Sequence, residues 1–383
     1  MLNNKRKIAI VTGTRAEYGY IRPVIKEIEK DPALDYEMIV TNMHLLSEFG
    51  NSVAEIERDG FKIGAKHYMA LDGYTNTTMA KSLGIFLMQL PETLERIKPD
   101  IILLAGDRGE QLMAAITGVH LNIPVAFIQS GEVSGNVDGV TRHAITKFAH
   151  IHFVSNEDAA RRVRKLGEQE FRIFLTGAPQ LDELREAKHT NPKKLASKYN
   201  LDLTNPLIIA VHHPVTEEYD QAAEQIMQTL LALKEIDAQT IVIHPNSDAG
   251  NKKIKEAVYL HSAPKTKIFR NLPREDFLGL MRISAVMVGN SSAGIIEAPF
   301  FGLPAVNIGG RQKGRMQGNN VINTGYHKKE IVKAVKKAML SKFKKGLRRG
   351  RSPYGDGRSA EKIVKILKEL TIDDKLIRKQ ITY

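Results

Sequence analysis

The chain has 383 residues, which is too long for one ordinary hydrophobic core and predicts two domains. Its 42% hydrophobic and 26% charged residues are typical of a soluble globular protein, and the absence of cysteine excludes disulfides, thiolate catalysis and cysteine-ligated metals. The net charge of +13 comes mostly from residues 328–351, where eleven Lys and Arg stand against one acid; this run fits binding to nucleic acid or to a membrane or, as we favour, a solvated helical face and loop.

The first half of the chain alternates short β-branched runs with longer amphipathic stretches. The N-terminal run is expected to be a strand and not a signal peptide, because its apolar part is short and no small-residue cleavage site follows. Helical patterns such as IRPVIKEIEK and LGIFLMQLPETLERI separate the runs, so we predict βαβ units in a doubly wound sheet. The runs that indicate buried parallel strands are KIAIVTG, YEMIVTN, DIILLAG, VAFIQSG and HIHFVSN.

A polar, charged stretch at 181–206 is expected to link this domain to a second one. The strand-like runs that follow it are LIIAVHH, TIVIHPN, TKIFRN, AVMVGN and AVNIGG, so two consecutive open α/β domains are predicted. Such sheets bind ligands at the carboxyl ends of their strands. The polar residues after each strand are therefore candidate site residues, and those of both domains are expected to face a shared cleft.

Two glycine turns of the first domain carry charged residues after a strand. Arg15 lies at a predicted helix start, which suits a diphosphate, although a surface Arg after a turn gives the same pattern. Asp107, with Arg108 beside it, lies at a strand end as an acid/base candidate or, alternatively, as a cap or local ion pair of the next helix. The GxGxxG fingerprint and the P-loop pattern are absent, which argues against NAD and the usual ATP sites.

Residues 130–150, SGEVSGNVDGVTRHAITKFAH, hold the densest group of chemically useful side chains. Glu132 and Asp138 could move protons, Arg142 could steady a leaving anion, and the glycines let the backbone approach a ligand. His143 adds a further titratable group. A charged surface loop has much the same composition, so the other motifs are needed to weigh the two interpretations.

The second domain carries its own candidates after two strands. His213 is favoured over the adjacent histidine as a ligand-facing residue, because the strand stops there. Residues 289–294, GNSSAG, expose backbone N–H groups at a predicted helix start, and two hydroxyls add donors, so a phosphate cradle is predicted. Glu297, about one and a half turns into that helix, could accept hydrogen bonds from both ribose hydroxyls; a surface Glu on a capped helix is the plain alternative.

These segments together resemble the UDP-N-acetylglucosamine 2-epimerase family, and most closely its hydrolysing branch. The resemblance runs from the first strand to about residue 360, through GTRAEYG, TNMHLL, GDR, GEVSGNVDGVTRHAITKFAH, HHPVT, HPNSDAG, GNSSAGIIEAP, GGRQKGR and SPYGDG. It implies two Rossmann-like doubly wound α/β domains of the glycosyltransferase-B type. The N-terminal domain with the catalytic carboxylates would span 1–185, the nucleotide-binding domain 200–360, and a final helix in 361–383 would pack back on the first domain.

The resemblance also implies roles for individual residues. Catalysis would fall to carboxylates at Asp107 and Asp138, helped by Arg142 and His213, with Glu132 as a further candidate. The residues expected to bind the nucleotide sugar are Arg15, Arg108, Gln129, His244, Asn246, Asp248, Asn290, Ser291, Ser292, Glu297 and Arg311.

The reaction that the resemblance implies is elimination followed by hydration. A base removes the proton from C2 of the sugar, the nucleoside diphosphate leaves C1, and water adds to the resulting 2-acetamidoglucal. The product would be free N-acetylmannosamine or a related manno-configured sugar for sialic or legionaminic acid synthesis, and no metal or redox cofactor is required. We expect a cytoplasmic homodimer or homotetramer that binds a UDP- or GDP-linked sugar, no specific nucleic acid and no membrane, since no stretch approaches the ~20 apolar residues of a membrane span.

One position departs from the family. Its usual His-Ile-Glu-Gly-Gly-Glu is Phe-Ile-Gln-Ser-Gly-Glu here, so that Gln129 replaces a catalytic carboxylate. An amide can form hydrogen bonds but cannot act as a base at neutral pH. Glu132 takes over part of the role, or Asp107 and Asp138 suffice for a related substrate, or the chain binds a nucleotide sugar without efficient turnover.

Other functions are compatible with the same motifs. A reversible epimerase would leave the nucleotide attached, and a glycosyltransferase of this architecture would need an acceptor site but not the acidic residues between 107 and 138. A nucleotide-sugar-binding regulator would fit the loss of the carboxylate at Gln129.

Overall fold

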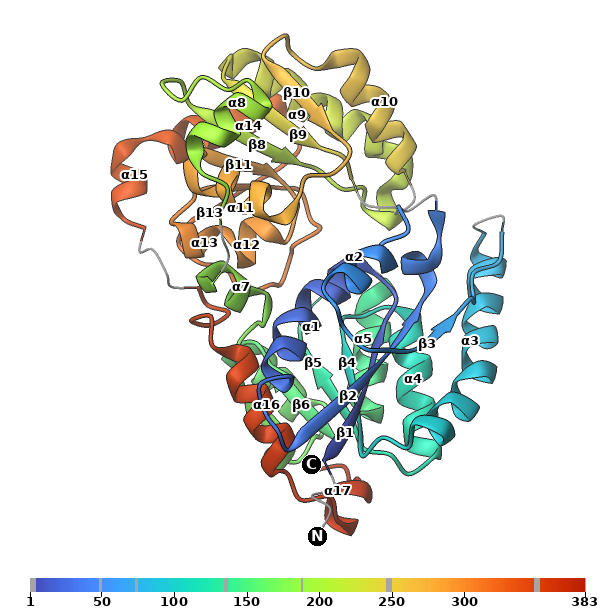
Figure 1. The fold of residues 1–383 in the computed structure, drawn as a ribbon. Coiled ribbons are helices and arrows are strands. Elements are labelled where there is room, and N and C mark those ends of the chain that lie inside the picture. The colour runs from blue at the N-terminus through green and yellow to red at the C-terminus, as the bar shows by residue number, and fades with distance from the viewer. Residues whose placement is uncertain are drawn as a thin grey trace. The chain divides into compact units, whose positions relative to one another are not determined.

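The structure, a computed structural model, describes residues 5–47, 50–72, 75–133, 137–186, 189–245, 250–347 and 352–382, apart from the side chains of residues 76, 137, 138, 186, 216 and 217. Its contacts divide the chain into two compact units (Figure 1). Unit 1 comprises Met1–Val133, Val137–Glu183 and Gly357–Tyr383, and unit 2 comprises Ser134–Asn136 and Leu184–Asp356. Within the described residues no helix is both long enough and apolar enough to span a membrane.

Unit 1 is built on a seven-stranded parallel sheet in the order β3-β2-β1-β4-β5-β6-β7. Six of its strands, in the order β3-β2-β1-β4-β5-β6, follow a Rossmann sheet, in which the order of the strands reverses between β1 and β4. The strands are β1 (Arg6–Thr12), β2 (Leu34–Thr41), β3 (Ile63–His67), β4 (Ile101–Ala105), β5 (Val125–Ile128), β6 (Ile151–Val154) and β7 (Ile173–Leu175).

The helices of unit 1 cover both faces of this sheet (Figure 1). They are α1 (Arg15–Ile28), α2 (Val53–Arg58), α3 (Asn76–Ile97), α4 (Gly109–His120), α5 (Val137–Phe148), α6 (Glu157–Lys165), α16 (Ser359–Glu369) and α17 (Asp374–Ile377), with 3-10 turns η1 (Asn42–Leu45) and η3 (Glu170–Arg172). Helix α7 (Gln180–Glu186) contains the point at which the chain passes into unit 2.

Unit 2 has a six-stranded parallel sheet in the order β10-β9-β8-β11-β12-β13, the same winding as in unit 1. Its strands are β8 (Leu207–Val211), β9 (Gln239–Ile243), β10 (Thr266–Phe269), β11 (Val286–Gly289), β12 (Ala305–Ile308) and β13 (Val321–Thr324). Its helices are α8 (Pro192–Tyr199), α9 (Ala222–Ile236), α10 (Asn251–His261), α11 (Arg274–Ile283), α12 (Ala293–Ile296), α13 (Ala298–Phe301), α14 (Lys328–Met339) and α15 (Ser341–Lys345), with the 3-10 turn η4 (Thr216–Gln221). The two sheets confirm the predicted pair of doubly wound α/β folds.

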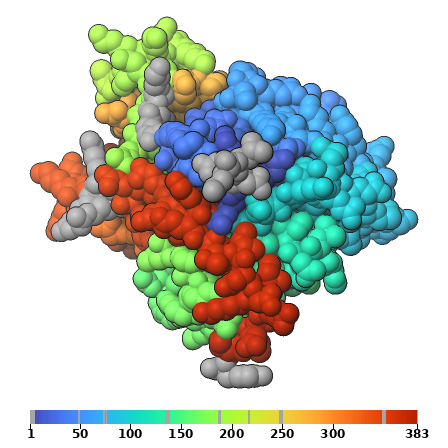
Figure 2. Space-filling model, turned by 60° about the horizontal axis from the view of Figure 1, so that its bottom comes forward, coloured from blue at the N-terminus to red at the C-terminus, as the bar shows by residue number. Residues whose placement is uncertain are grey.

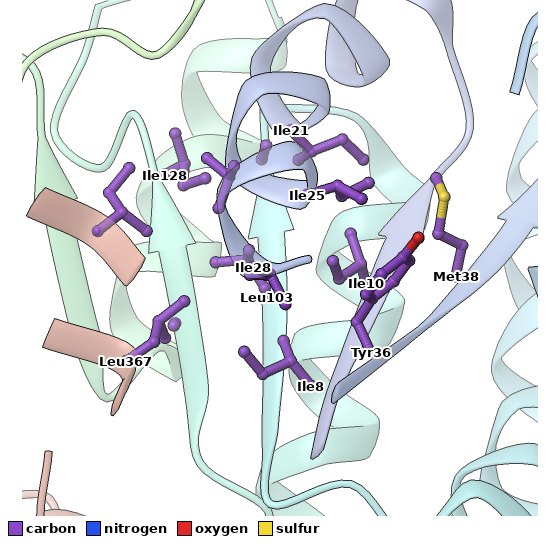
Figure 3. Packing of buried hydrophobic residues seen from close by; sticks show 14 of the residues in the cluster. Ile8, Ile10, Ile21, Ile25, Ile28, Tyr36, Met38, Leu103, Ile128 and Leu367 are labelled. Carbon is purple, nitrogen blue, oxygen red and sulfur yellow. The ribbon is translucent and has the colours of Figure 1, made fainter. Parts of the chain in front are cut away.

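The strands bury both of their faces, which explains why their sequences are continuously apolar. Successive residues of β1 point to opposite faces: Ile8 and Ile10 pack toward α1 and α16, whereas Ala9 and Val11 pack toward α3 and α4. Figure 3 shows the first of these layers, with Ile8, Ile10, Leu103 and Ile128 of the sheet beside Ile21, Ile25 and Ile28 of α1 and Leu367 of α16.

Two findings differ from the expectations of the sequence, and the third agrees with the helical face expected for the basic segment. The stretch 181–206, expected as a linker, contains most of α7 and all of α8. The helix expected after residues 289–294 is interrupted, because Pro299 has no N–H group to continue the ladder, and two four-residue helices, α12 and α13, result. The basic segment begins with α14, which buries Ile331 and Val335 and exposes lysines on its other face; residues 348–351 lie outside the described chain.

The last segment of unit 1 follows unit 2 in the sequence and packs on the helices that cover the Rossmann sheet. Figure 2 shows it in red, across the blue and green parts of unit 1. Helix α16 packs on α1, and Arg6 donates hydrogen bonds to the carbonyls of Leu367 (2.5 Å) and Lys368 (2.9 Å). The Asp182 carboxylate accepts the first backbone N–H groups of α16, from Ser359 (2.9 Å) and Ala360 (2.5 Å).

Asp182→Ala is expected to lower the free energy of unfolding by about 1–3 kcal/mol, because two buried N–H groups at the start of α16 would lose their acceptor. Urea denaturation followed by circular dichroism measures this change. Asp374→Ala is the control, since its exposed carboxylate pairs with the exposed Arg378 within α17. Equal stability of the two variants would contradict the capping role.

Candidate functional site

An ion pair between β4 and α5 lies at the carboxyl edge of the first sheet. Arg142 donates from Nη2 to Asp107 Oδ2 and from Nη1 to the carbonyl of Gln129 (3.0 Å). The Arg142 side chain is 3% exposed and that of Asp107 is 20% exposed. The guanidinium is therefore fixed inside the protein, while a fifth of the Asp107 side chain reaches the solvent. This geometry brings together two of the predicted catalytic residues.

The turn that follows β5 carries Gln129 and Glu132, and both are buried. Gln129 has a φ of +64°, a left-handed conformation that is uncommon for a residue other than Gly, and its carbonyl accepts the bond from Arg142. Glu132 Oε1 accepts a hydrogen bond from Nδ2 of Asn156 (3.0 Å), the N-cap of α6. Gln129 therefore contacts Arg142 through its backbone carbonyl, whereas Glu132 contacts Asn156 through its side chain.

Two buried glutamates below the first glycine turn were not among the predicted site residues. Glu17 Oε2 accepts the N–H groups of Gly13 (2.6 Å) and Thr14 (3.2 Å), and a Cβ on Gly13 would lie 2.1 Å from Oε1 of Glu110. Burial and the charge of Glu110 raise the pKa of Glu17 well above its usual value. Glu17 thus fixes the turn that leads to exposed Arg15, and Glu110 leaves no space for a side chain at position 13.

The other predicted residues of unit 1 are placed as follows. Arg108 is the N-cap residue of α4, and Arg15 begins α1. The side chain of Asp138, in the first turn of α5, lies outside the described residues, as do Asn246 and Asp248 of the other unit. Their predicted roles therefore rest on the sequence alone.

In unit 2, Asn290 joins the carboxyl ends of β8 and β11. Its Oδ1 accepts the N–H of His213 (2.7 Å) and its Nδ2 donates to the carbonyl of His213 (2.8 Å), while its own carbonyl accepts from Gln312 (2.8 Å) and Arg311 (3.3 Å). The side chain is fully buried. Its amide is thus used to fix His213, and we infer that Asn290, predicted as a ligand, acts by bracing this turn.

The turn before Asn290 requires a glycine at position 289. Its φ is +130°, and a Cβ would lie 2.0 Å from the carbonyl oxygen of Val211. Ser291 and Ser292 follow, half-buried, and the Ser291 hydroxyl accepts the N–H of Ala293 (3.3 Å). These hydroxyls and backbone N–H groups suit an anion, although α12 is too short to add much of a helix dipole.

Glu297 lies between α12 and α13 and is held by a residue that the sequence did not point to. Arg274, the first residue of α11, donates from Nη1 to Glu297 Oε2 (3.1 Å) and from Nη2 to Oε1 (3.3 Å). The Glu297 side chain is 13% exposed. A carboxylate whose orientation is fixed by an arginine fork can accept hydrogen bonds from a diol without first being ordered.

Two further histidines end strands of this sheet. His212, adjacent to His213, is buried, and burial lowers its pKa to about 4, so that it is neutral. His244, after β9, stacks edge-on against Tyr259 with ring centroids 5.4 Å apart, and burial lowers its pKa also. Among the described residues no group of three or more His, Asp and Glu is placed to hold a metal ion.

Comparison with known proteins adds the following. A family model described as UDP-N-acetylglucosamine 2-epimerase matches residues 26–368. A Legionella pneumophila protein named UDP-N,N'-diacetylbacillosamine 2-epimerase (hydrolyzing) is 38% identical, covering 98% of each chain. A Campylobacter jejuni protein named GDP/UDP-N,N'-diacetylbacillosamine 2-epimerase (hydrolyzing) is 34% identical, covering 97% of each.

The fold is similar to that of the crystal structure of UDP-GlcNAc 2-epimerase from Neisseria meningitidis bound to UDP-GlcNAc. The TM-score is 0.81 at 19% identity, and the match covers 95% of this chain and all of that one. The family match over residues 26–368 and the identity to both hydrolysing enzymes along nearly the whole chain lead to one conclusion: this chain belongs to the UDP-N-acetylglucosamine 2-epimerase family.

Proposed function

We propose that the protein is a hydrolysing nucleotide-sugar 2-epimerase. It converts a UDP-linked 2-acetamido sugar to the free manno-configured sugar and UDP, for the synthesis of nonulosonic acids. The observation that carries this proposal is the 38% identity, over 98% of both chains, to an enzyme named for hydrolysing 2-epimerisation of UDP-N,N'-diacetylbacillosamine. We therefore rank a 2,4-diacetamido sugar above N-acetylglucosamine as its substrate, and UDP above GDP.

Unit 1 supplies the acid/base groups in this proposal. A carboxylate takes the C2 proton while the C1–O bond breaks and its electron pair leaves with the diphosphate, giving the C1=C2 glycal. Water then bonds to C1, and C2 receives a proton on the opposite face. The partly exposed Asp107 carboxylate, oriented by Arg142, and the predicted Asp138 are the proposed proton carriers. Since Gln129 cannot exchange protons, Glu132 is the third candidate.

Unit 2 supplies the nucleotide contacts. Ser291, Ser292 and the backbone N–H groups around them would bind the diphosphate, with Arg311 nearby, and Glu297 would accept the ribose hydroxyls. Preorganised donors of this kind stabilise the negative charge that develops on the departing diphosphate. The C2 proton is only weakly acidic, so this stabilisation is the main demand of the reaction.

Arg274→Met is expected to weaken UDP binding about ten-fold, equivalent to ~1.4 kcal/mol. The Glu297 carboxylate would lose its fixed orientation, and its charge would no longer be balanced beside an anionic ligand. Isothermal titration with UDP measures the change. Arg282→Met, an exposed change on the same helix, is the control and should bind as wild type; equal affinities for both variants would remove Arg274 from the site.

The function is tested by proton NMR in heavy water with UDP-N,N'-diacetylbacillosamine and with UDP-N-acetylglucosamine. Free manno-configured sugar that carries deuterium at C2, together with UDP, is the expected result. A sugar that stays linked to the nucleotide would indicate the reversible reaction instead. No conversion of either substrate, or of the GDP-linked analogue, would refute the proposal.

Assembly and location are proposed on the same basis. We expect a homodimer or homotetramer in the cytoplasm, as the resemblance implies. Light scattering of the purified protein gives the mass in solution directly, and a value of 42.8 kDa, the mass of one chain, would contradict the expected assembly.

A further inference from the structure

A buried polar chain connects the C-terminal tail of unit 1 with the turn that follows β5. Lys379 Nζ lies 2.7 Å from Glu168 Oε2, which lies 3.1 Å from His152 Nε2, and His152 Nδ1 lies 3.1 Å from the hydroxyl of Ser130. Ser130, His152 and Glu168 are essentially fully buried. Ser130 belongs to the same turn as Gln129 and Glu132, but no part of the proposed reaction uses it.

The hydrogen-bond directions along this chain are determined by its charges. Burial alone would raise the pKa of Glu168, but the bond from His152 and the charge of Lys379 outweigh it and lower the pKa to about 2. Burial lowers the pKa of His152 to about 4, so the imidazole is neutral and donates from Nε2 to Glu168. Its Nδ1 must then accept the proton of the Ser130 hydroxyl, which fixes that side chain from below.

The same lysine also caps the helix that carries Arg142. Lys379 Nζ donates to the carbonyls of Thr146 (3.0 Å), Lys147 (2.7 Å) and Ala149 (2.6 Å), which end α5. The last carbonyls of a helix have no partner within the helix, and a cation there also opposes the negative end of its dipole. The tail thus reaches the Asp107–Arg142 pair through α5 and the Gln129 carbonyl through Ser130.

The tail is itself fastened, so that Lys379 is held in place. Fully buried Arg172 donates to the carbonyls of Lys375 (2.8 Å) and Leu376 (2.7 Å) at the end of α17. Beyond Lys379, the N–H of Thr382 donates to the carbonyl of Gly167 (2.9 Å). In Figure 2 the tail, in red, lies over the green part of unit 1.

We propose that Lys379, Glu168, His152 and Ser130 are positioning residues for the acid/base groups of unit 1. The C-terminal tail acts as a brace that sets both the Gln129–Glu132 turn and the α5 helix, and none of the four touches the substrate. This inference rests on the proposed hydrolysing 2-epimerase function, because its effect is read in that reaction.

The test compares Lys379→Met with Arg378→Met, which removes the neighbouring cation, an exposed side chain that pairs with Asp374. UDP titration gives the number of binding-competent molecules, and turnover is expressed per UDP site. Lys379→Met is expected to lower kcat more than five-fold while KM and the Kd of UDP change less than two-fold, and Lys379→Arg should restore most of the activity. Arg378→Met should match wild type.

A second measurement separates positioning from a loss of folded protein. When the acid/base groups are displaced, hydration of the glycal slows relative to its escape, so the share of glycal among the products rises. Molecules that are simply unfolded do not change that share. Ser130→Ala, which interrupts the chain without touching Lys379, is expected to raise the glycal share in the same way.

The proposal is overturned if Lys379→Met keeps kcat within five-fold of wild type, or if kcat falls with an unchanged glycal share in both variants. If wild type converts no nucleotide sugar, the proposed function itself is refuted, and the brace proposal that rests on it is refuted as well. Normal turnover by wild type and Lys379→Met alike would refute only the brace.

Discussion

Asp107→Asn is expected to lower turnover by about 10²–10⁴-fold, the usual contribution of a general acid or base. The amide keeps the size of the side chain and can still accept a hydrogen bond from Arg142, so the turn after β4 should keep its shape. It cannot carry a proton between the sugar and water. We expect the affinity for UDP to stay nearly unchanged, because the proposed nucleotide contacts lie in unit 2.

The measurement is the rate of UDP release, with UDP binding followed by titration calorimetry. Asp374→Asn is the control, since Asp374 also pairs with an arginine but is exposed and lies on α17. Turnover of Asp107→Asn within ten-fold of wild type would remove Asp107 from proton transfer. Parallel loss of UDP binding would mean instead that the substitution disturbs more than the acid/base site.

Gly289→Ala is expected to abolish measurable UDP binding by disrupting the turn after β11. The new Cβ would collide with the Val211 carbonyl, and φ at +130° is strained for any residue with a side chain. Strain of this kind costs on the order of 1–3 kcal/mol before the collision is added. The Val211 carbonyl accepts the N–H of Asn290 (3.1 Å), so its displacement would also release the bonds that fix His213.

Gly310→Ala is the matched control, because a Cβ there meets no atom within 4 Å. Thermal unfolding with and without UDP measures both the stability of each variant and its stabilisation by the ligand. Gly289→Ala should melt at a lower temperature and gain little from the ligand, whereas Gly310→Ala should behave as wild type. An unchanged response of Gly289→Ala to UDP would show that the turn tolerates the displacement.

The inner strands of both sheets could be predicted from the sequence, but of the edge strands only β10, in TKIFRN, could. The inner strands are buried on both faces, and burial on both faces requires unbroken apolar runs, such as IILLA in β4. The other edge strands, β3, β7 and β13, are only partly buried, and none of them has an apolar run longer than three residues. Burial, which produces the signal, is what these strands lack.

The candidate site shows the same limit at the level of single residues. Asp107 and Arg142 could be singled out because each follows a glycine-rich motif, but their pairing across 35 positions depends on the tertiary fold. Arg274 gave no signal at all, since an Arg at the start of a helix is common and only its approach to Glu297 gives it meaning. Asn290 could be predicted as a site residue, but nothing in the sequence reveals that its side chain already bonds to the backbone of His213.

The discontinuity of unit 1 has a consequence for synthesis on the ribosome. Unit 2 is nearly contiguous and can complete its core as soon as residue 356 has emerged, while unit 1 must wait for Ile363 and Leu367, which fill its core from the far end of the chain. Until then the apolar face of α1 is uncovered and open to chaperones or to aggregation. Premature termination just before α16 would therefore leave the later-encoded unit mature and the earlier-encoded one unfinished.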